Sequence, residues 1–204
     1  MRTYRQVRPN LIPFVDYHTN ILLVFILILA FSSITKKNDS SIQLTELYEI
    51  VMTWNPESSS DVDLWSQDSA GNIVGFNRRE GGQGSLFALK RDDLGASSDR
   101  RADGTIVKIN EEIISIRGTK EGEYIVNGHC YRKYPGETGP LTVKVKLVKI
   151  KPFKEIIVKE RVFNHSGDEE TFFRFKFDKN GEVTETNELP AKIAVISGAE
   201  SAEQ

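Results

Sequence analysis

Residues 141–150 read LTVKVKLVKI, and their pattern predicts a β-strand that buries one face. The apolar residues Val143, Val145 and Leu147 alternate with lysines, and this period of two points successive side chains to opposite faces of a sheet. The alternation changes phase after Leu147, where a β-bulge would restore it. The stretch therefore predicts a sheet with a core on one side and a row of solvated lysines on the other.

Short runs of the same kind recur from residue 47 to about residue 195. They are rich in β-branched and aromatic residues, and Gly, Pro, Asn and Asp separate them, as expected for strands joined by turns. The runs are 47–54, 62–66, 73–76, 86–90, 105–109, 113–116, 124–131, 141–150, 155–163 and 171–178. Many short strands at this spacing are typical of a β-sandwich. The sequence predicts a jelly-roll-like, all-β sandwich over residues 47–196, followed by a disordered tail at 197–204.

A different kind of sequence precedes the strands. Residues 11–34 read LIPFVDYHTNILLVFILILAFSSI, and about 20 mainly apolar residues suffice to cross a bilayer. We therefore expect one transmembrane α-helix, with residues 1–10 as an N-terminal tail and residues 35–46 as a linker. A signal peptide is the alternative, because the purely apolar run is short, but no clear A-x-A cleavage site follows it.

The charges on both sides of this helix predict its orientation. Arg2, Arg5 and Arg8 precede it, whereas Lys36 and Lys37 follow it. By a margin of one positive residue, the positive-inside rule places the N-terminus in the cytoplasm. The helix would then be a single-pass anchor in the inner (cytoplasmic) membrane, with the later domain periplasmic or extracellular.

Asp16 is an ionisable residue inside the apolar stretch. Such a group costs roughly 2.5–3.5 kcal/mol near the centre of a membrane helix, and it usually faces a protein interior or a path for protons or ions. Thr19 and Asn20 lie three and four residues further on and share its helix face. The pattern predicts an ion path. The alternative is a carboxylate that snorkels to the interface, with Thr19 and Asn20 in helix contacts.

The segment Arg8–Asp16 reads RPNLIPFVD and stands directly before the apolar run. It resembles the N-terminus of ExbD/TolR-type proteins, the single-pass subunits of proton-driven motors that are related in plan to the flagellar stator subunit MotB. The family pattern is an Asn, a Pro-Phe or Pro-Leu, one further residue and an Asp before the membrane helix. Asn10, Pro13, Phe14 and Asp16 fall on those positions.

This resemblance implies that Asp16 carries protons while partner helices rotate around it. It also implies a homodimer inside a pentameric, ExbB/MotA-like multi-helix partner, a 5:2 complex. The family usually continues with apolar residues after the aspartate, whereas residues 17–20 here read YHTN, so the transported ion is open between H⁺ and Na⁺.

Two functions follow from these observations. The first is a subunit of an ion-driven rotary motor whose sandwich binds, or transmits force to, an extracytoplasmic protein or polymer. The alternative is a membrane-tethered β-sandwich that recognises a ligand, polymer or protein and transports no ion.

The predicted sandwich also carries clustered aspartates. Asp61 and Asp63 lie two residues apart in a predicted strand and so share a face, while Asp92 and Asp93 follow a predicted hairpin. Carboxylate oxygens are the ligands that Ca²⁺ prefers. These four residues are therefore the candidate calcium ligands.

A second resemblance bears on the same aspartates. The succession of TW, DVDLW, VGF, RDDLG and GEYIV over about residues 47–150 resembles prepeptidase C-terminal-type domains, small sandwiches on secreted and surface proteins, some of which bind calcium. The alternative is that Asp61 and Asp63 cap a strand and pair with Arg78 and Arg79.

Composition excludes several other classes of protein. A formal net charge of −2 over 204 residues argues against a nucleic-acid partner, and a single cysteine excludes an internal disulfide. That cysteine, Cys130, adjoins His129 in a predicted strand, so the two side chains point to opposite faces. The sequence has no phosphate-binding loop and no G-x-S-x-G elbow. We expect no enzymatic activity and, calcium apart, no cofactor.

Overall fold

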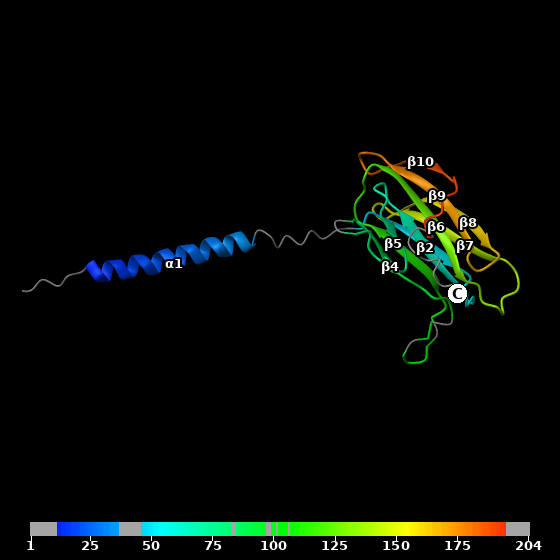
Figure 1. Ribbon diagram of the computed structural model, residues 1–204, viewed down its shortest axis with the longest axis horizontal. Coiled ribbons are helices and arrows are strands. Elements are labelled where there is room, and N and C mark those ends of the chain that lie inside the picture. The colour runs from blue at the N-terminus through cyan, green and yellow to red at the C-terminus, as the bar shows by residue number, and fades with distance from the viewer. Residues whose placement is uncertain are drawn as a thin grey trace, which may run out of the picture. The chain divides into compact units, whose positions relative to one another are not determined.

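The computed structural model describes residues 12–36, 46–82, 85–96, 99–100, 102–105 and 107–194 (Figure 1). The chain divides into two compact units, Met1–Gln43 and Leu44–Gln204, and each is described by itself. The predicted N-terminal tail, residues 37–45 of the predicted linker and the predicted C-terminal tail lie outside the described residues.

Helix α1 (Ile12–Lys36) is the described part of the first unit and covers nearly all of the predicted helical stretch. Its only proline, Pro13, lies in the first turn, where a missing N–H costs nothing. Side chains are described from Val15 to Leu29, and all of them are exposed. Within the described residues, no helix reaches the combination of length and apolarity that a membrane crossing needs.

The second unit is a sandwich of two antiparallel five-stranded sheets, which confirms the predicted β-sandwich (Figure 1). Sheet 1 has the strand order β4-β5-β1-β7-β8, and sheet 2 has the order β10-β9-β6-β2-β3. The strands of sheet 1 are β4 (Phe87–Arg91), β5 (Asn110–Ile116), β1 (Tyr48–Trp54), β7 (Leu141–Lys149) and β8 (Lys154–Phe163). Those of sheet 2 are β10 (Val183–Asn187), β9 (Glu169–Phe177), β6 (Gly122–Arg132), β2 (Asp61–Gln67) and β3 (Ile73–Val74).

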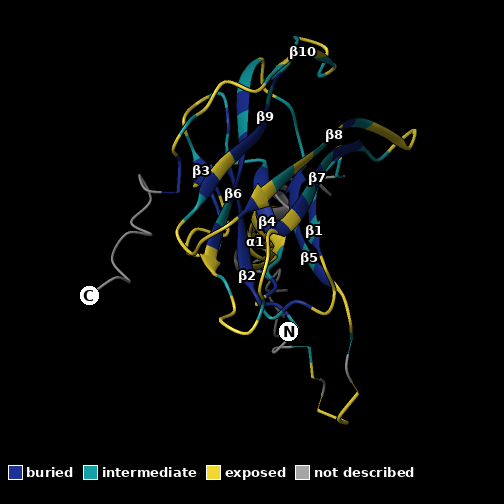
Figure 2. Ribbon diagram, turned by 90° about the vertical axis from the view of Figure 1, so that its right-hand side faces the viewer, coloured by how far each residue is buried: buried dark blue, intermediate teal, exposed yellow. Residues whose placement is uncertain are grey.

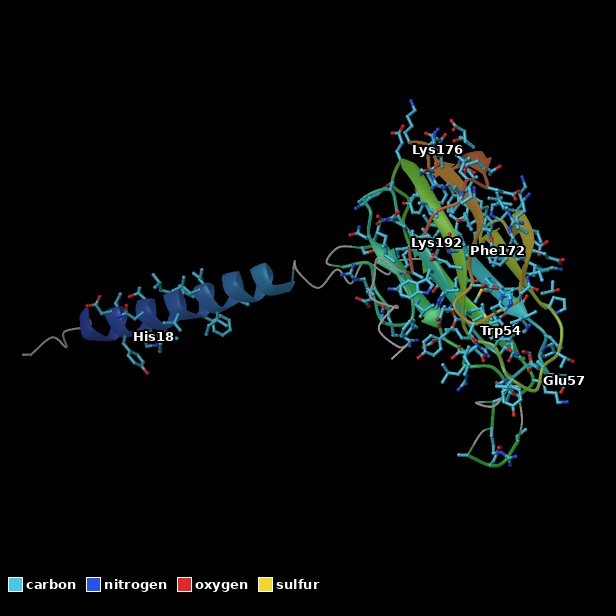
Figure 3. The ribbon with its side chains drawn as sticks, turned by 45° about the vertical axis from the view of Figure 1, so that its right-hand side comes forward. His18, Trp54, Glu57, Phe172, Lys176 and Lys192 are labelled. Carbon is cyan, nitrogen blue, oxygen red and sulfur yellow. The ribbon has the colours of Figure 1, made fainter. Side chains whose placement is uncertain are left out.

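The core fills the space between the sheets, where inward residues of the central strands are buried (Figure 2). Aromatic rings dominate one part of it: the Tyr124 ring stacks on Phe175 at 5.2 Å and meets Phe177 edge-on at 5.1 Å. Each fully buried side chain of this size contributes about 1.5–3 kcal/mol. Trp54, at the end of β1, lies inside the sandwich, whereas Glu57, in the following loop, lies on its surface (Figure 3).

Strand β7 contains the predicted bulge. Its register against β8 shifts between Leu147 and Val148, and both side chains are buried. On the outer face, Lys144 and Lys146 reach glutamates of β8, with Nζ–Oε1 distances of 2.8 and 2.5 Å respectively. The lysine row therefore faces away from the core, as the alternation predicted.

Two predictions about strands were wrong. The segment 105–109 is not a strand where the structure describes it; Val107 N instead donates a hydrogen bond to Asp99 O in the preceding loop. Conversely, β10 was not predicted, because its sequence VTETN is polar and mostly exposed, as suits an edge strand paired only with β9.

Candidate functional site

The predicted ion-path residues lie on one face of α1. Asp16, Thr19 and Asn20 are all exposed, and the spacing of three and four residues in a continuous helix keeps them together. The Thr19 hydroxyl faces its own helix, with Oγ1 2.9 Å from Val15 O and 3.0 Å from Asp16 O. Thr19 therefore offers a partner only its oxygen lone pairs, so Asp16 and Asn20 carry the polar character of this face.

The residues of the N-terminal motif are described only in part. Asn10 lies outside the described residues. Pro13 and Phe14 lie in the first turn of α1, but their side chains are outside the part that the structure describes. The next position of the motif, Asp16, begins the exposed face just described.

The sandwich brings three carboxylates together. One oxygen each from Asp63 on β2, Asp92 after β4 and Glu112 on β5 lies within 4.8 Å of the others. These three residues are called the acidic trio below. Two of them, Asp63 and Asp92, were predicted calcium ligands, whereas Glu112 was not.

Glu112 belongs to the inward-facing side of β5 and is fully buried. Its Oε2 accepts a hydrogen bond from Leu64 N at 2.6 Å, and its Oε1 accepts one from Asp93 N at 3.3 Å. Strand β3 pairs with β2 at Ser66 and Gln67, so no strand of the described residues borders the first half of β2 on that side. Glu112 therefore satisfies the Leu64 N–H, a donor that a neighbouring strand would otherwise satisfy.

The environment of Glu112 favours its protonated form. Burial, followed by the negative charge of Asp63, raises the pKa of Glu112 well above its ordinary range, although the hydrogen bond from Leu64 N opposes the shift. A carboxyl group without a bound cation is costly to ionise in such a place.

Asp63 faces His129 across β2 and β6. The two residues are register partners, and His129 Nδ1 lies 3.5 Å from Asp63 Oδ2. Burial raises the pKa of Asp63, and the interaction with His129 opposes that rise. His129 thus orients one carboxylate of the acidic trio.

Asp61 lies on β2, two residues before Asp63 of the acidic trio. It is 5% exposed, and its Oδ1 is buried without a hydrogen-bond partner. Burial and then the charge of Asp63 raise the pKa of Asp61 to about 7, against the opposing charge of its register partner Arg132.

Asp92 and Asp93 have different surroundings despite being adjacent. Asp92 Oδ2 accepts a hydrogen bond from Arg79 Nη1 at 3.2 Å, while its Oδ1 is buried without a partner. Asp93 is occupied by its own loop: Oδ2 lies 3.0 Å from Arg91 Nη2, and Oδ1 accepts the Gly95 N–H. Asp93 is therefore held by its own loop, whereas Asp92 has an oxygen near those of Asp63 and Glu112.

The alternative prediction was that Asp61 and Asp63 pair with Arg78 and Arg79, and the observed pairs are different. Arg79 pairs with Asp92 on the far side of a hairpin, and Asp63 pairs with His129. The missed residue Glu112 alternates with Ile114 and Ile116 in the sequence, so its inward direction could have been predicted. Its meeting with Asp63 could not, because that contact joins opposite sheets.

Cys130 is a buried thiol in the middle of the sandwich. Burial, followed by the charge of Asp168, raises its pKa to about 12. The thiolate is the nucleophilic form of cysteine, so at neutral pH this group is inert.

No protein-family model matches the sequence, and no curated protein is similar to it. The solved structure of the unknown function protein SAV2460 is similar to this chain with a TM-score of 0.44 and 16% sequence identity, over 74% of this chain and 94% of that chain.

Proposed function

We propose that the chain is a membrane-anchored subunit of an ion-driven complex. In this proposal α1 lies in the inner membrane among partner helices, Asp16 carries a proton, and the sandwich acts on an extracytoplasmic target. The observation that carries the proposal is the placement of Asp16 on an apolar, exposed helix, directly after the Asn10…Pro13-Phe14 pattern.

The exposed apolar side chains of α1 support the proposal that this helix lies in an apolar environment. Nine consecutive residues, Ile21–Leu29, are apolar, and every one is exposed. Contiguous apolar surface of this kind marks contact with other proteins or with lipid. With the flanking residues the apolar stretch runs from Leu11 to Ile34, which is the length on which the anchor proposal rests.

The position of Asp16 supports a role in ion movement. A carboxylate on a membrane helix needs a partner that shields it, since its insertion costs roughly 2.5–3.5 kcal/mol near the centre. Moving one elementary charge through the membrane field is worth about 2.3 kcal/mol per 100 mV. A partner ring that shields Asp16 and lets it exchange protons would therefore couple the field to motion.

The assembly is the first test of this proposal. The full chain is co-expressed with a multi-helix ExbB/MotA-like protein encoded beside it and purified in detergent. The mass of the intact complex is then measured. We expect a complex of two chains with five partner subunits. We also expect Asp16→Asn to assemble, because the amide removes the charge and keeps the shape, and Ile26→Lys to fail, because it places a charge in the apolar run. A chain that purifies alone as a monomer contradicts the proposal.

A polar cavity supports the second candidate, a tethered binding module. The cavity has a volume of about 480 Å³ and is lined by residues of the β1–β2 loop, by Lys133 and by residues 137–142. Glu137 stands at its wall and accepts hydrogen bonds from Ser58 and Ser60. This candidate predicts that the chain needs no partner ring and that Asp16→Asn is without effect in cells.

A further inference from the structure

We propose that the acidic trio Asp63, Asp92 and Glu112 binds one Ca²⁺ ion between the two sheets. The proposal is independent of α1 and of the ion-driven function. It replaces the predicted ligand set by one that shares only Asp63 and Asp92 with it.

The first support is geometry. Three carboxylate oxygens from three separate segments lie within 4.8 Å of one another, close enough to share one ion. Among the described residues, each Glu112 oxygen accepts one backbone hydrogen bond, and a carboxylate oxygen can accept two, so each keeps a lone pair for an ion. The ion would thus add to the existing hydrogen bonds and would not break them.

The second support is unpartnered oxygen next to the acidic trio. Within the described residues, Asp61 Oδ1 and Asp92 Oδ1 are both buried without a hydrogen-bond partner. Asp61 is only 5% exposed and lies two residues before Asp63 on β2, and the charges of Asp63 and Asp92 both contribute to the raised pKa of Asp61. Buried unpaired acceptors are costly in a native protein and require an explanation. A cation that these oxygens approach supplies one.

The chemistry of the ligands selects the class of ion. All the candidate ligand atoms are hard carboxylate oxygens, which suit Ca²⁺ and Mg²⁺ better than Zn²⁺ or Cu²⁺. Ca²⁺ accepts irregular sets of six to eight oxygens at about 2.3–2.6 Å, whereas Mg²⁺ demands near-ideal octahedral geometry. Ligands that arrive from a strand, a loop and the opposite sheet form an irregular set. His129 remains a partner that orients Asp63, in the manner usual for groups behind metal ligands.

The position of the site gives the ion a structural consequence. Asp63 belongs to sheet 2, whereas Glu112 and Asp92 belong to sheet 1 and the loop after β4. The open half of β2 is held to sheet 1 by Glu112. A bound Ca²⁺ would clamp this edge of the sandwich and stabilise the folded state.

Calcium titration of the full chain tests the proposal. The chain in detergent is stripped with EGTA, exchanged into EGTA-free buffer and titrated with CaCl₂ by calorimetry, and its Tm is recorded with and without the ion. We expect one saturable Ca²⁺ per chain and a rise in Tm of about 5 °C at a hundredfold excess over Kd. We also expect a smaller rise with MgCl₂ at the same concentration.

Variants identify the ligands. Glu112→Gln and Asp92→Asn should each weaken calcium binding at least about tenfold, because each removes one charged ligand. Asp92→Asn keeps the test valid if the buried variant does not fold, since the side chain that pairs with Asp92 in the described part of the chain is the exposed Arg79. Asp178→Asn, in the β9–β10 turn, is the matched control and should bind as the natural chain does.

Three results would overturn the proposal. One is the absence of saturable calcium binding and of any change in Tm. Another is natural affinity in folded Asp92→Asn. The third is an equal rise in Tm with Mg²⁺, which would leave a divalent site but remove the assignment to calcium.

Discussion

Glu112 shows how a single residue can be predicted in direction and missed in function. Its alternation with Ile114 and Ile116 predicts an inward side chain, yet a carboxylate in a core is expensive unless it has partners. The partners are Leu64 N on the opposite sheet and Asp93 N in a loop. Both are far from Glu112 in sequence, so the sequence indicates Asp63 and Asp92 as candidate ligands but cannot name the third.

Gly75 packs directly against the Trp65 ring, so a larger residue at this position should destabilise the sandwich. A Cβ at this position would lie 2.3 Å from Trp65 Cε3, and the Trp65 side chain is fully buried. The ring has no room to move away, so Gly75→Ala should lower the free energy of unfolding by about 1–3 kcal/mol. Urea unfolding measures it, with Glu170→Ala on the surface as the control. Equal stability of the two variants would contradict the packing described here.

The lowered pKa of Glu137 should make the stability of the sandwich depend on pH. Burial opposes its ionisation, but hydrogen bonds from Ser58 Oγ, Ser59 N and Ser60 Oγ prevail and hold its pKa below the ordinary value. A carboxyl group whose folded pKa is lowered stabilises the fold above its unfolded pKa of about 4.3, and the effect disappears as pH falls through the folded pKa.

Removal of this charge should therefore matter at neutral pH and not in acid. We expect Glu137→Gln to lower the free energy of unfolding by about 1 kcal/mol at neutral pH, after allowance for solvent screening of a half-buried group. The difference from the natural chain should shrink as pH falls below about 4.3 and vanish once pH is below the lowered pKa of folded Glu137. Denaturant unfolding across pH measures it, and a constant difference at all pH values would exclude the charge as its cause.

At the scale of elements, the sequence predicts strands best where one face is buried. The phase change after Leu147 correctly predicted the bulge in β7, because a one-residue slip would turn apolar side chains outward. Strand β10 escaped prediction because an edge strand with polar, exposed residues has no such pattern. Segment 105–109 was wrongly predicted to be a strand, because the spacing of its apolar residues does not reveal the loop contact that Val107 N makes with Asp99 O.

The outer face of β7 and β8 gives a prediction for cross-strand pairs. Lys146 Nζ lies 2.5 Å from Glu155 Oε1, but both side chains are substantially exposed. Solvent screens such a pair, and holding two long side chains costs entropy. A double-mutant cycle with Lys146→Ala and Glu155→Ala should therefore give a coupling energy below about 1 kcal/mol. A much larger coupling would mean that this face is covered in the protein.

At the scale of the whole molecule, the two units obey different physical rules. The sandwich buries its apolar residues between sheets, and its core residues run from Tyr48 to Phe177. Helix α1 instead exposes every described side chain, most of them apolar. Exposed apolar surface of this kind is typical of contact with other proteins or with lipid, whereas the second unit buries its apolar residues in its own core.

This division predicts that the sandwich folds without the helix. A chain of residues 44–204 contains the complete core, so its Tm should agree with that of the sandwich transition in the full chain. Differential scanning calorimetry of both proteins in the same detergent measures this. A truncated chain that is unfolded, or that melts well below the full chain, would show that α1 contributes to the stability of the sandwich.

Proton flux through the assembled complex measures whether Asp16 carries the ion. The chain and its multi-helix partner are reconstituted in proteoliposomes with a membrane potential, and the internal pH is followed. We expect flux with the natural chain, none with Asp16→Asn, and full flux with Glu170→Gln, an acid-to-amide change on the sandwich. Unchanged flux in Asp16→Asn complexes would contradict the claim that Asp16 carries the ion.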